Sequence, residues 1–354
     1  MISCEKSIMF IVCPNGMGHF KRVMAVVGEI LKLTKLLQIT IVCQSWQRSK
    51  IDKHFSVPVR FFEDLMEPGV SYEFFEDTFF EQKKYLKWEE SVAKLEAFKN
   101  ADLIVSDNLC GILEHHDRVI LMSSFLWMDL LQADDRFRCV SQEFVEREKQ
   151  LLSSRHPKML CVEDIVMPAV RNYTEAVPLP WFAESLMTDR ADYTEEPTVV
   201  TIAVLLGRTG VMDPWLKAFV SVAKEEGIVV KLPSPYDKEY NTESFSFSDD
   251  AFQAVDMVLC RPGIGVITDC IRNQTVMLTL FEDNNTEMEH NAKAIAEVLQ
   301  LESLGVDPCV YKACEAVRNL SKDYIQLNRM QKRLRTRQLG GTQKAADYIL
   351  KSLE

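Results

Sequence analysis

The chain has 354 residues, more than one hydrophobic core usually fills, so its length predicts two domains. Hydrophobic residues make up 47% of it and charged residues 26%, which excludes a collagen, a disordered tail and a small disulfide-stapled protein. With 41 Lys and Arg against 52 Asp and Glu, the formal net charge is −11. This balance predicts no extended basic face, so we expect no nucleic-acid partner.

The ten cysteines include no C-x-x-C pair, and several lie in apolar runs, such as Cys13 and Cys43. This spacing favours buried free thiols in a reducing compartment, and it predicts no metal site. No apolar run approaches the roughly 20 residues of a membrane-spanning helix. The first residues lack the features of a signal peptide. We therefore expect a cytoplasmic protein.

Short β-rich apolar runs alternate with helical patterns through the first half of the chain. The predicted strands are residues 7–13, 38–43, 57–62, 101–106 and 118–122. The predicted helices are residues 17–33, 79–99 and 125–152. Strand–helix alternation predicts a parallel sheet that is covered by helices on both faces.

Residues 168–197 interrupt this alternation, because they include Pro178, Pro180 and Pro197 and have weak periodicity. We interpret them as the boundary between two domains. The alternation then restarts, with predicted strands at 198–206, 228–232, 255–260 and 276–280, and predicted helices at 213–226, 249–254, 264–272 and 287–299. Two consecutive halves of this kind predict a two-domain α/β protein with doubly wound sheets.

A Gly-rich turn directly follows the first predicted strand. It reads Asn15-Gly16-Met17-Gly18-His19. Glycines at the start of a helix let the backbone come close to a ligand, and the helix N-terminus offers free N–H groups. The third glycine of the dinucleotide-binding fingerprint is missing. A His at this place is well positioned as a general base, and the alternative is a tight turn whose His only caps or packs.

Asp107 comes just after the strand predicted at 101–106, at the edge where ligands bind in open α/β sheets. A carboxylate there can orient His19 and stabilise its cationic form, which is the division of labour in catalytic triads. The alternative is an Asp that forms a turn or caps a helix, which is the more frequent role of a single Asp.

The strongest signal lies at the end of the strand predicted at 255–260. Its members are Arg261, Pro262, Gly263, Ile264 and Gly265. The Arg supplies a fixed positive charge, and the two glycines open a helix whose N–H groups converge with it, which suits a diphosphate. Asp269, further along this helix, can accept hydrogen bonds from ribose hydroxyls. The alternative is a Pro-Gly turn that only begins a helix.

Two weaker signals follow other strands of the second half. Gly207 and Thr209 lie in a Gly-rich turn after its first predicted strand, where they suit a phosphate or a sugar. Glu287 and Asn291 lie at the start of the helix after its last predicted strand, where polar groups can meet a sugar ring.

Taken in order, these motifs resemble those of the GT-B nucleotide-sugar glycosyltransferases, of the UDP-glycosyltransferase and family 28 C-terminal type. The family's first loop, G-x-G-H-x-x-R, is matched by Gly16, Gly18, His19 and Arg22. Its donor loop, R-P-G-x-G-T-x-x-E, is matched by Arg261, Pro262, Gly263 and Gly265, with Asp269 in the place of the Glu. Its E-Q-x-x-N-A motif is matched by Glu287, Asn291 and Ala292.

The resemblance implies a GT-B fold, in which two Rossmann-like doubly wound domains face each other across a cleft. It places an acceptor-side domain at 1–178, a donor-binding domain at 179–336, and a helix that crosses back at 337–354. It implies an inverting, metal-independent glycosyltransferase that uses no cofactor besides a nucleotide-diphosphate sugar, UDP-linked, and transfers the sugar to an acceptor hydroxyl.

In that scheme His19 deprotonates the acceptor and Asp107 supports it. The donor-binding residues that the resemblance implies are Gly16, Gly18, Gly207, Thr209, Arg261, Gly263, Ile264, Gly265, Asp269, Glu287 and Asn291. Val266 and Met288 depart from the family pattern, which has a hydroxyl residue and Gln at these places. Two other functions share the fold, namely hydrolysis of nucleotide sugars and non-catalytic binding of them. The basic run at 329–337 predicts a solvated helix face, and the alternative is contact with a membrane surface.

Overall fold

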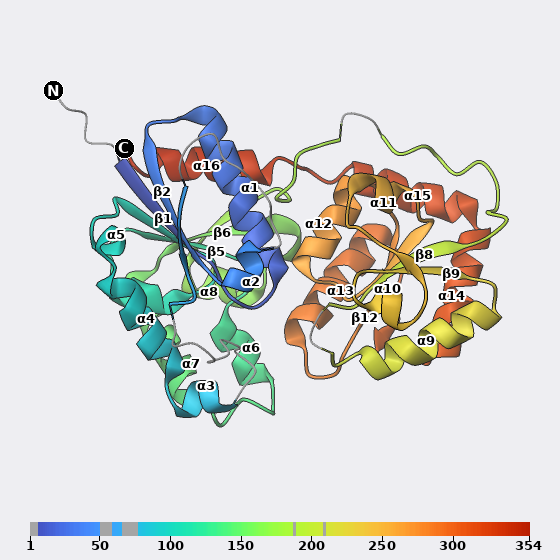
Figure 1. Cartoon of the computed structure of the whole chain (residues 1–354), viewed down its shortest axis with the longest axis horizontal. Coiled ribbons are helices and arrows are strands. Elements are labelled where there is room, and N and C mark those ends of the chain that lie inside the picture. Colours follow the sequence, from blue (N-terminus) through green and yellow to red (C-terminus); the bar gives the residue numbers. More distant parts are fainter. Residues whose placement is uncertain (1–5, 50–58, 66–76, 187–188, 208–209) are drawn as a thin grey trace. The chain divides into compact units, whose positions relative to one another are not determined.

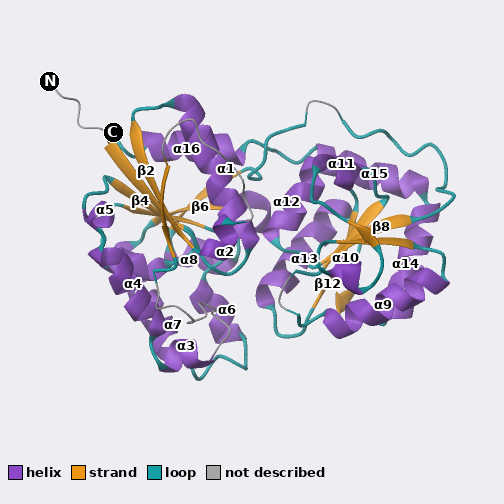
Figure 2. Ribbon diagram, viewed as in Figure 1, coloured by secondary structure: helices purple, strands orange, loops and turns teal. Residues whose placement is uncertain are grey.

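The computed structural model describes residues 6–49, 59–65, 77–186, 189–207 and 210–354. The chain forms two compact units. Unit 1 contains Met1–Phe182 together with Gly340–Glu354, and unit 2 contains Ala183–Leu339. The predicted domain boundaries fall after residues 178 and 336, whereas the units divide after Phe182 and Leu339. In each unit, helices enclose a sheet (Figure 2).

Unit 1 is built on a parallel sheet of seven strands in the order β3-β2-β1-β4-β5-β6-β7. The strands are β1 (Lys6–Ile11), β2 (Leu37–Cys43), β3 (Val59–Glu63), β4 (Leu103–Ser106), β5 (Val119–Met122), β6 (Lys158–Val162) and β7 (Glu175–Leu179). The strand order reverses between β1 and β4. Ligands of open α/β sheets bind beyond the carboxyl ends of strands at such a reversal.

The helices of unit 1 are α1 (Met17–Leu33), α2 (Ser45–Arg48), α3 (Asp77–Glu81), α4 (Lys84–Lys94), α5 (Glu96–Lys99), α6 (Trp127–Ala133), α7 (Gln142–Arg155), α8 (Pro168–Tyr173) and α16 (Gly341–Lys351). Although α1 and α16 come from opposite ends of the chain, they pack side by side (Figure 1). The main-chain N–H of Gly341 donates to the carbonyl of Trp181 (2.9 Å), which fixes the start of α16. An alanine Cβ at Gly341 would lie 2.2 Å from the carbonyl oxygen of Pro180, so this approach requires glycine.

Three predictions for unit 1 are wrong in detail. The helix predicted at 79–99 is divided into three, because Lys83 has a left-handed backbone (φ 50°) and the chain is extended at Leu95. The helix predicted at 125–152 is divided at Asp134, whose carboxylate accepts from the N–H of Arg136 (2.9 Å) and ends α6. The proposed boundary at 168–197 begins with α8 and β7, which belong to unit 1.

The strand β7 was hidden by its proline. Pro178 lacks an N–H, but β7 pairs only with β6 and forms the edge of the sheet, where a missing donor is tolerated. The strand β6 was also missed, because no element is predicted between the helix that ends at residue 152 and the boundary that begins at residue 168. The sheet of unit 1 therefore has seven strands, whereas five strands are predicted for the first half of the chain.

Unit 2 is built on a parallel sheet of six strands in the order β10-β9-β8-β11-β12-β13. The strands are β8 (Thr201–Leu205), β9 (Val229–Leu232), β10 (Glu243–Ser244), β11 (Met257–Cys260), β12 (Met277–Phe281) and β13 (Gly305–Val306). The helices are α9 (Asp213–Glu225), α10 (Tyr236–Glu239), α11 (Asp249–Gln253), α12 (Ile264–Arg272), α13 (Thr286–Leu299), α14 (Val310–Lys322) and α15 (Tyr324–Arg335). The strand order reverses between β8 and β11, so unit 2 has a reversal of its own.

The predicted strands and helices of the second half are confirmed, and α12 has the predicted bounds. Cys13 and Cys43 are buried free thiols, as predicted, whereas Cys139 and Cys309 are exposed. In the basic run, Arg333 donates to the carbonyl of Leu299 (2.6 Å) and Arg335 pairs with Asp192 (2.9 Å), so both bind within unit 2. None of the helices in the described part of the chain combines the length and apolar character that a membrane span requires.

Candidate functional site

The turn after β1 is held in place by hydrogen bonds from a side chain of α2. Gly16 has φ +111°, a conformation that favours glycine, and no atom lies within 4 Å of the position that a Cβ would occupy. The Gln47 side chain is fully buried, and its Nε2 donates to the carbonyls of Cys13 and Gly16 at 3.0 Å each. The turn is therefore rigid, and it leads directly into α1, where Gly18 and His19 occupy the first turn.

The structure brings together His19, in the helix after β1, and Asp107, directly after β4, and these two strands flank the reversal of the sheet. Nδ1 of His19 lies 2.9 Å from Oδ1 of Asp107. The main-chain N–H of Asp107 donates to the carbonyl of Ile11 at the end of β1 (2.7 Å), so the backbone fixes this pair as well. The side chain of Asp107 is fully buried, while that of His19 is 12% exposed.

A third side chain, Arg22, completes this cluster. Its Nη2 donates to the same Oδ1 of Asp107 (2.5 Å) and to the carbonyl of Met122 (3.3 Å). Its guanidinium also lies over the ring of Phe182, 5.9 Å from the centroid. Burial alone would raise the pKa of Asp107, but the charges of Arg22 and His19 and the hydrogen bonds from both hold that pKa below its ordinary value. Asp107 is therefore ionised.

This arrangement assigns a role to each nitrogen of His19. An ionised carboxylate only accepts hydrogen bonds, so the hydrogen of a neutral His19 lies on Nδ1, which faces Asp107. Nε2 then carries the free lone pair, and it can take a proton from a hydroxyl group. The ring of Phe125 packs edge-on against His19, with centroids 6.3 Å apart, and limits how the imidazole can turn.

Unused polar atoms surround this cluster. Oδ2 of Asp107 and both polar side-chain atoms of Asn108 are buried and have no hydrogen-bond partner among the residues that the structure describes. Asn108 also has a left-handed backbone (φ 60°). Buried polar atoms are normally paired, so orphaned ones mark capacity for water or ligand. Asn108 is not among the predicted site residues, although its place directly after Asp107 is a usable signal.

In unit 2, the loop between β11 and α12 has an open approach. Gly263 has φ −69°, which any residue adopts, and no atom lies within 4 Å of a Cβ built there. Neither backbone conformation nor packing therefore requires glycine at this position. Ile264 and Gly265 form the first turn of α12, where N–H groups lack partners within the helix. The loop can admit a ligand that comes close to the main chain.

Arg261, the predicted diphosphate ligand, already has a partner. Its Nε donates to Oε2 of Glu282 (2.8 Å), and its Nη2 donates to Oε1 (2.5 Å). Glu282 comes directly after β12, the strand next to β11, so the two side chains meet at one edge of the sheet. The sequence analysis did not single out Glu282, whose position just past a predicted strand was the available signal.

Helices α12 and α13 place the remaining predicted donor residues of this edge. Asn291 is buried, and its Nδ2 donates to the carbonyl of Pro262 (3.0 Å), so its side chain holds the donor loop. Asp269 on α12 and Glu287 on α13 are partly exposed. Met288, which stands at the family's Gln position, is buried against Phe281 and Ala292 in a small apolar cluster.

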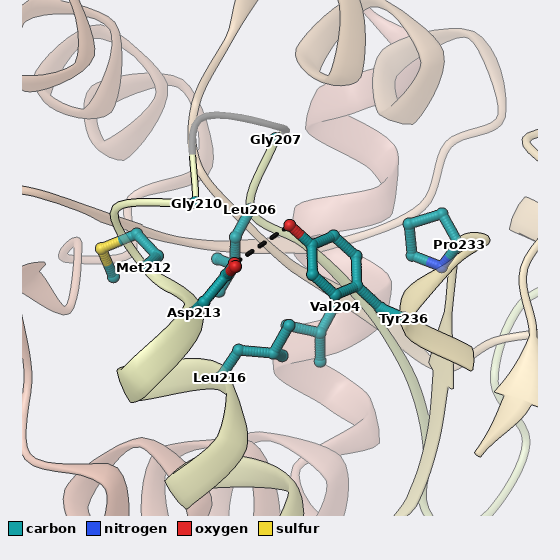
Figure 3. A pocket seen from close by; sticks show the side chains of 9 residues that line it. All are labelled: Val204, Leu206, Gly207, Gly210, Met212, Asp213, Leu216, Pro233 and Tyr236. Carbon is teal, nitrogen blue, oxygen red and sulfur yellow. Dashed lines mark hydrogen bonds between the residues drawn. The ribbon is translucent and has the colours of Figure 1, made fainter. Parts of the chain in front are cut away.

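A small pocket lies at the ends of β8 and β9 in unit 2 (Figure 3). The residues that line it are Val204, Leu206, Gly207, Gly210, Met212, Asp213, Leu216, Pro233 and Tyr236. The hydroxyl of Tyr236 donates to Oδ1 of Asp213 across it (3.0 Å). Gly207 has φ +83°, and a Cβ built at this position would lie 3.5 Å from a nitrogen of the Arg261 guanidinium. This turn therefore adjoins the donor loop. Thr209 lies outside the described residues.

No group of three or more His, Cys, Asp and Glu side chains that could hold a metal ion occurs in the described ranges. Within each site, the charged side chains pair with one another. In unit 1 these are His19, Arg22 and Asp107, and in unit 2 they are Arg261 and Glu282.

Comparison with known proteins finds no matching family model and no matching curated protein. Solved structures do match over the whole chain. A UDP-glucosyltransferase from Polygonum tinctorium superposes with a TM-score of 0.70 at 12% identity, covering 100% of this chain and 99% of the other. Arabidopsis thaliana UGT89C1, complexed with UDP-L-rhamnose, gives 0.62 at 11% identity, covering 99% and 100%. Acinetobacter baumannii MurG gives 0.60 at 13%, covering 98% and 99%.

The chain has the GT-B fold.

The GT-B fold predicted from the motifs is confirmed, with one parallel sheet flanked by helices in each unit. At these identities the match establishes the fold alone. The GT-B framework explains why the two loops with the strongest signals follow β1 and β11, since each strand flanks the reversal of its own sheet.

Proposed function

We propose that this protein is a glycosyltransferase that moves a sugar from a UDP-linked sugar to an acceptor hydroxyl, with inversion and without a metal. The observation that carries the proposal is the His19–Asp107 pair at the strand reversal of unit 1. An imidazole fixed through Nδ1 by an ionised carboxylate is the arrangement that activates hydroxyl nucleophiles in unrelated enzymes.

In this proposal Nε2 of His19 takes the proton of the acceptor hydroxyl as its oxygen attacks the anomeric carbon. The bond from that carbon to the diphosphate oxygen breaks, and the electron pair leaves with the nucleoside diphosphate. Asp107 stabilises the imidazolium that forms, because its carboxylate is buried and ionised 2.9 Å away. Attack from the face opposite the leaving group inverts the anomeric configuration.

Unit 2 holds the donor in this proposal. The first turn of α12 supplies N–H groups to the diphosphate, and the open approach at Gly263 lets the diphosphate come close. The guanidinium of Arg261, which is held by Glu282, lies in the same loop. The ribose meets Asp269, and the sugar meets Glu287. Asn291 acts indirectly, since its hydrogen bond to Pro262 fixes the loop.

A thermal-shift screen with nucleotides and nucleotide sugars tests donor binding, because a ligand that binds the folded form raises the melting temperature. We expect UDP and UDP-sugars to raise it more than the other nucleotides do. No response to any nucleotide would contradict the proposal. The donors named for UGT89C1 and the Polygonum tinctorium enzyme make UDP-L-rhamnose and UDP-glucose the first choices.

Turnover assays then separate transfer from hydrolysis. Purified protein is incubated with the donor, first alone and then with a hydroxyl acceptor. The first acceptors are quercetin, with which UGT89C1 has been crystallised, and indoxyl, which the Polygonum tinctorium enzyme glucosylates. We expect a glycosylated acceptor and little free sugar, and we expect EDTA to leave the rate unchanged. Rapid release of free sugar without an acceptor would instead assign the site to hydrolysis.

A further inference from the structure

The Arg261–Glu282 pair gives the proposed donor loop an unusual charge balance. The two parallel hydrogen bonds hold the guanidinium in a bidentate geometry, and Nδ2 of Asn285 donates to Oε1 of Glu282 as well (2.7 Å). The side chains of Arg261 and Glu282 are only 18% and 7% exposed. A bidentate pair of this kind is fixed before any ligand arrives, so most of the positive charge of Arg261 is compensated.

Negative charge extends beyond the pair. Asp283 follows Glu282 and is exposed. The pKa of Asp307, at the end of β13, is raised by partial burial and by the charges of Glu282 and Asp283. The N–H of Asp307 donates to the carbonyl of Phe281 (3.0 Å), which fixes it beside β12. The edge of the sheet next to Arg261 therefore carries the three carboxylates of Glu282, Asp283 and Asp307, which outnumber the one guanidinium of Arg261.

We propose that Glu282 is a specificity-determining residue that makes the donor site favour the nucleotide sugar over the free nucleoside diphosphate. This rests on the proposed function, in which Arg261 lies beside the diphosphate. When a nucleotide sugar loses its sugar, the terminal phosphate gains a further ionisable oxygen, so the free diphosphate carries more negative charge near neutral pH. An unpaired guanidinium would bind that product more tightly than the substrate. A guanidinium paired with Glu282 removes this advantage, and the product leaves more easily.

The test compares UDP with UDP-glucose by calorimetry in two variants of the full chain. Glu282→Gln is isosteric and keeps an oxygen for Arg261, but it removes the negative charge. We expect it to tighten UDP binding more than UDP-glucose binding. The ratio of the affinity for UDP to the affinity for UDP-glucose should rise roughly fivefold. Arg261→Gln leaves Glu282 uncompensated, and we expect it to move the ratio in the opposite direction.

Glu289→Gln is the matched control, because it removes the same charge from an exposed residue of α13 that pairs with Lys293 (2.6 Å). We expect its affinity ratio to equal that of the wild type. If Arg261→Gln does not fold, Glu282→Gln alone decides the test. An unchanged ratio in Glu282→Gln, with UDP still bound by the wild type, overturns the inference and leaves the proposed function standing. A wild type that binds neither ligand overturns both.

Discussion

His19 and Arg22, one turn apart on α1, converge on a single oxygen of Asp107, at 2.9 Å and 2.5 Å. One carboxylate oxygen thus serves a candidate base and a permanent cation. Arg22 keeps Asp107 ionised, yet it also offsets part of the negative charge that His19 experiences. The cluster is therefore a three-member unit in which Arg22 positions the carboxylate and moderates its effect on the imidazole.

Removing the imidazole tests the base. We expect His19→Ala to lower the rate of transfer by a factor of about 10²–10⁴, the usual contribution of a positioned general base. Calorimetry should find an affinity for UDP within roughly twofold of the wild type, because the residues proposed to hold the diphosphate and the ribose lie in unit 2. A variant that retained wild-type transfer would remove His19 from its role.

Replacing Arg22 tests its hold on the carboxylate. In Arg22→Met the buried Asp107 loses the guanidinium that compensates its charge. Removing one partner of a buried ion pair leaves an uncompensated charge, so we expect the free energy of unfolding to fall by about 3–5 kcal/mol. Arg22→Lys keeps the charge and should lose less. Urea unfolding measures both variants, and an Arg22→Met variant as stable as the wild type would limit Arg22 to packing.

Glu148 on α7 predicts a dependence of stability on pH. Its carboxylate is buried, and its Oε2 accepts from the N–H of Met128 at the start of α6 (3.0 Å). Burial, and then the charge of Glu89, raise the pKa of Glu148 from its ordinary 4.5 to about 8, while Arg147 and the contacts with Met128 and Cys110 oppose the rise. Between these values the folded protein holds a proton that the unfolded chain has lost. Stability due to this group is therefore present below pH 4.5 and falls as the pH rises to about 8.

Glu148→Gln removes this titration and can still accept from Met128. We expect its free energy of unfolding to exceed that of the wild type by on the order of 3 kcal/mol at pH 9, with the difference shrinking as the pH is lowered to 5. Urea unfolding at several pH values measures this. Glu146→Gln, an exposed change on the same helix, is the control. A difference that did not vary with pH would show that Glu148 is ionised in the folded protein.

Two glycines make a matched pair for packing. In Gly341→Ala the new methyl group would meet the main-chain carbonyls of Pro180 and Trp181, at 2.2 and 2.8 Å, which cannot swing aside. We expect a loss of roughly 2–3 kcal/mol of unfolding free energy. Gly28→Ala inside α1 meets nothing within 4 Å and should instead stabilise by up to about 1 kcal/mol. Denaturant unfolding of both variants checks the contrast, and equal effects would refute it.

Sequence alone predicted the elements that carry strong periodicity and the loops that follow buried strands. His19 and Asp107 could be placed together because their strands end at the same sheet edge. Arg22 matched a motif, but its contact with Asp107 depends on which face of α1 packs on the sheet. Glu282 was missed for a similar reason, since the chain separates it from Arg261 by a whole helix and strand.

Local backbone conformation accounts for the other failures. The amphipathic pattern continues through Lys83, whose left-handed backbone divides α3 from α4, and nothing in the residue type announces it. Pro178 argued against a strand, and only the position of β7 at the edge of the sheet makes it acceptable. Hydrophobic periodicity encodes neither the backbone conformation at Lys83 nor the position of β7 in the sheet.

The partnership of α16 with α1 has a consequence for biosynthesis. A ribosome makes α16 after all of unit 2, so throughout that interval the nascent unit 1 lacks the helix that packs against α1. Unit 1 can complete its fold only once α16 has been made. Anyone who wishes to express it separately must splice Gly340–Glu354 back onto a fragment that ends at Phe182.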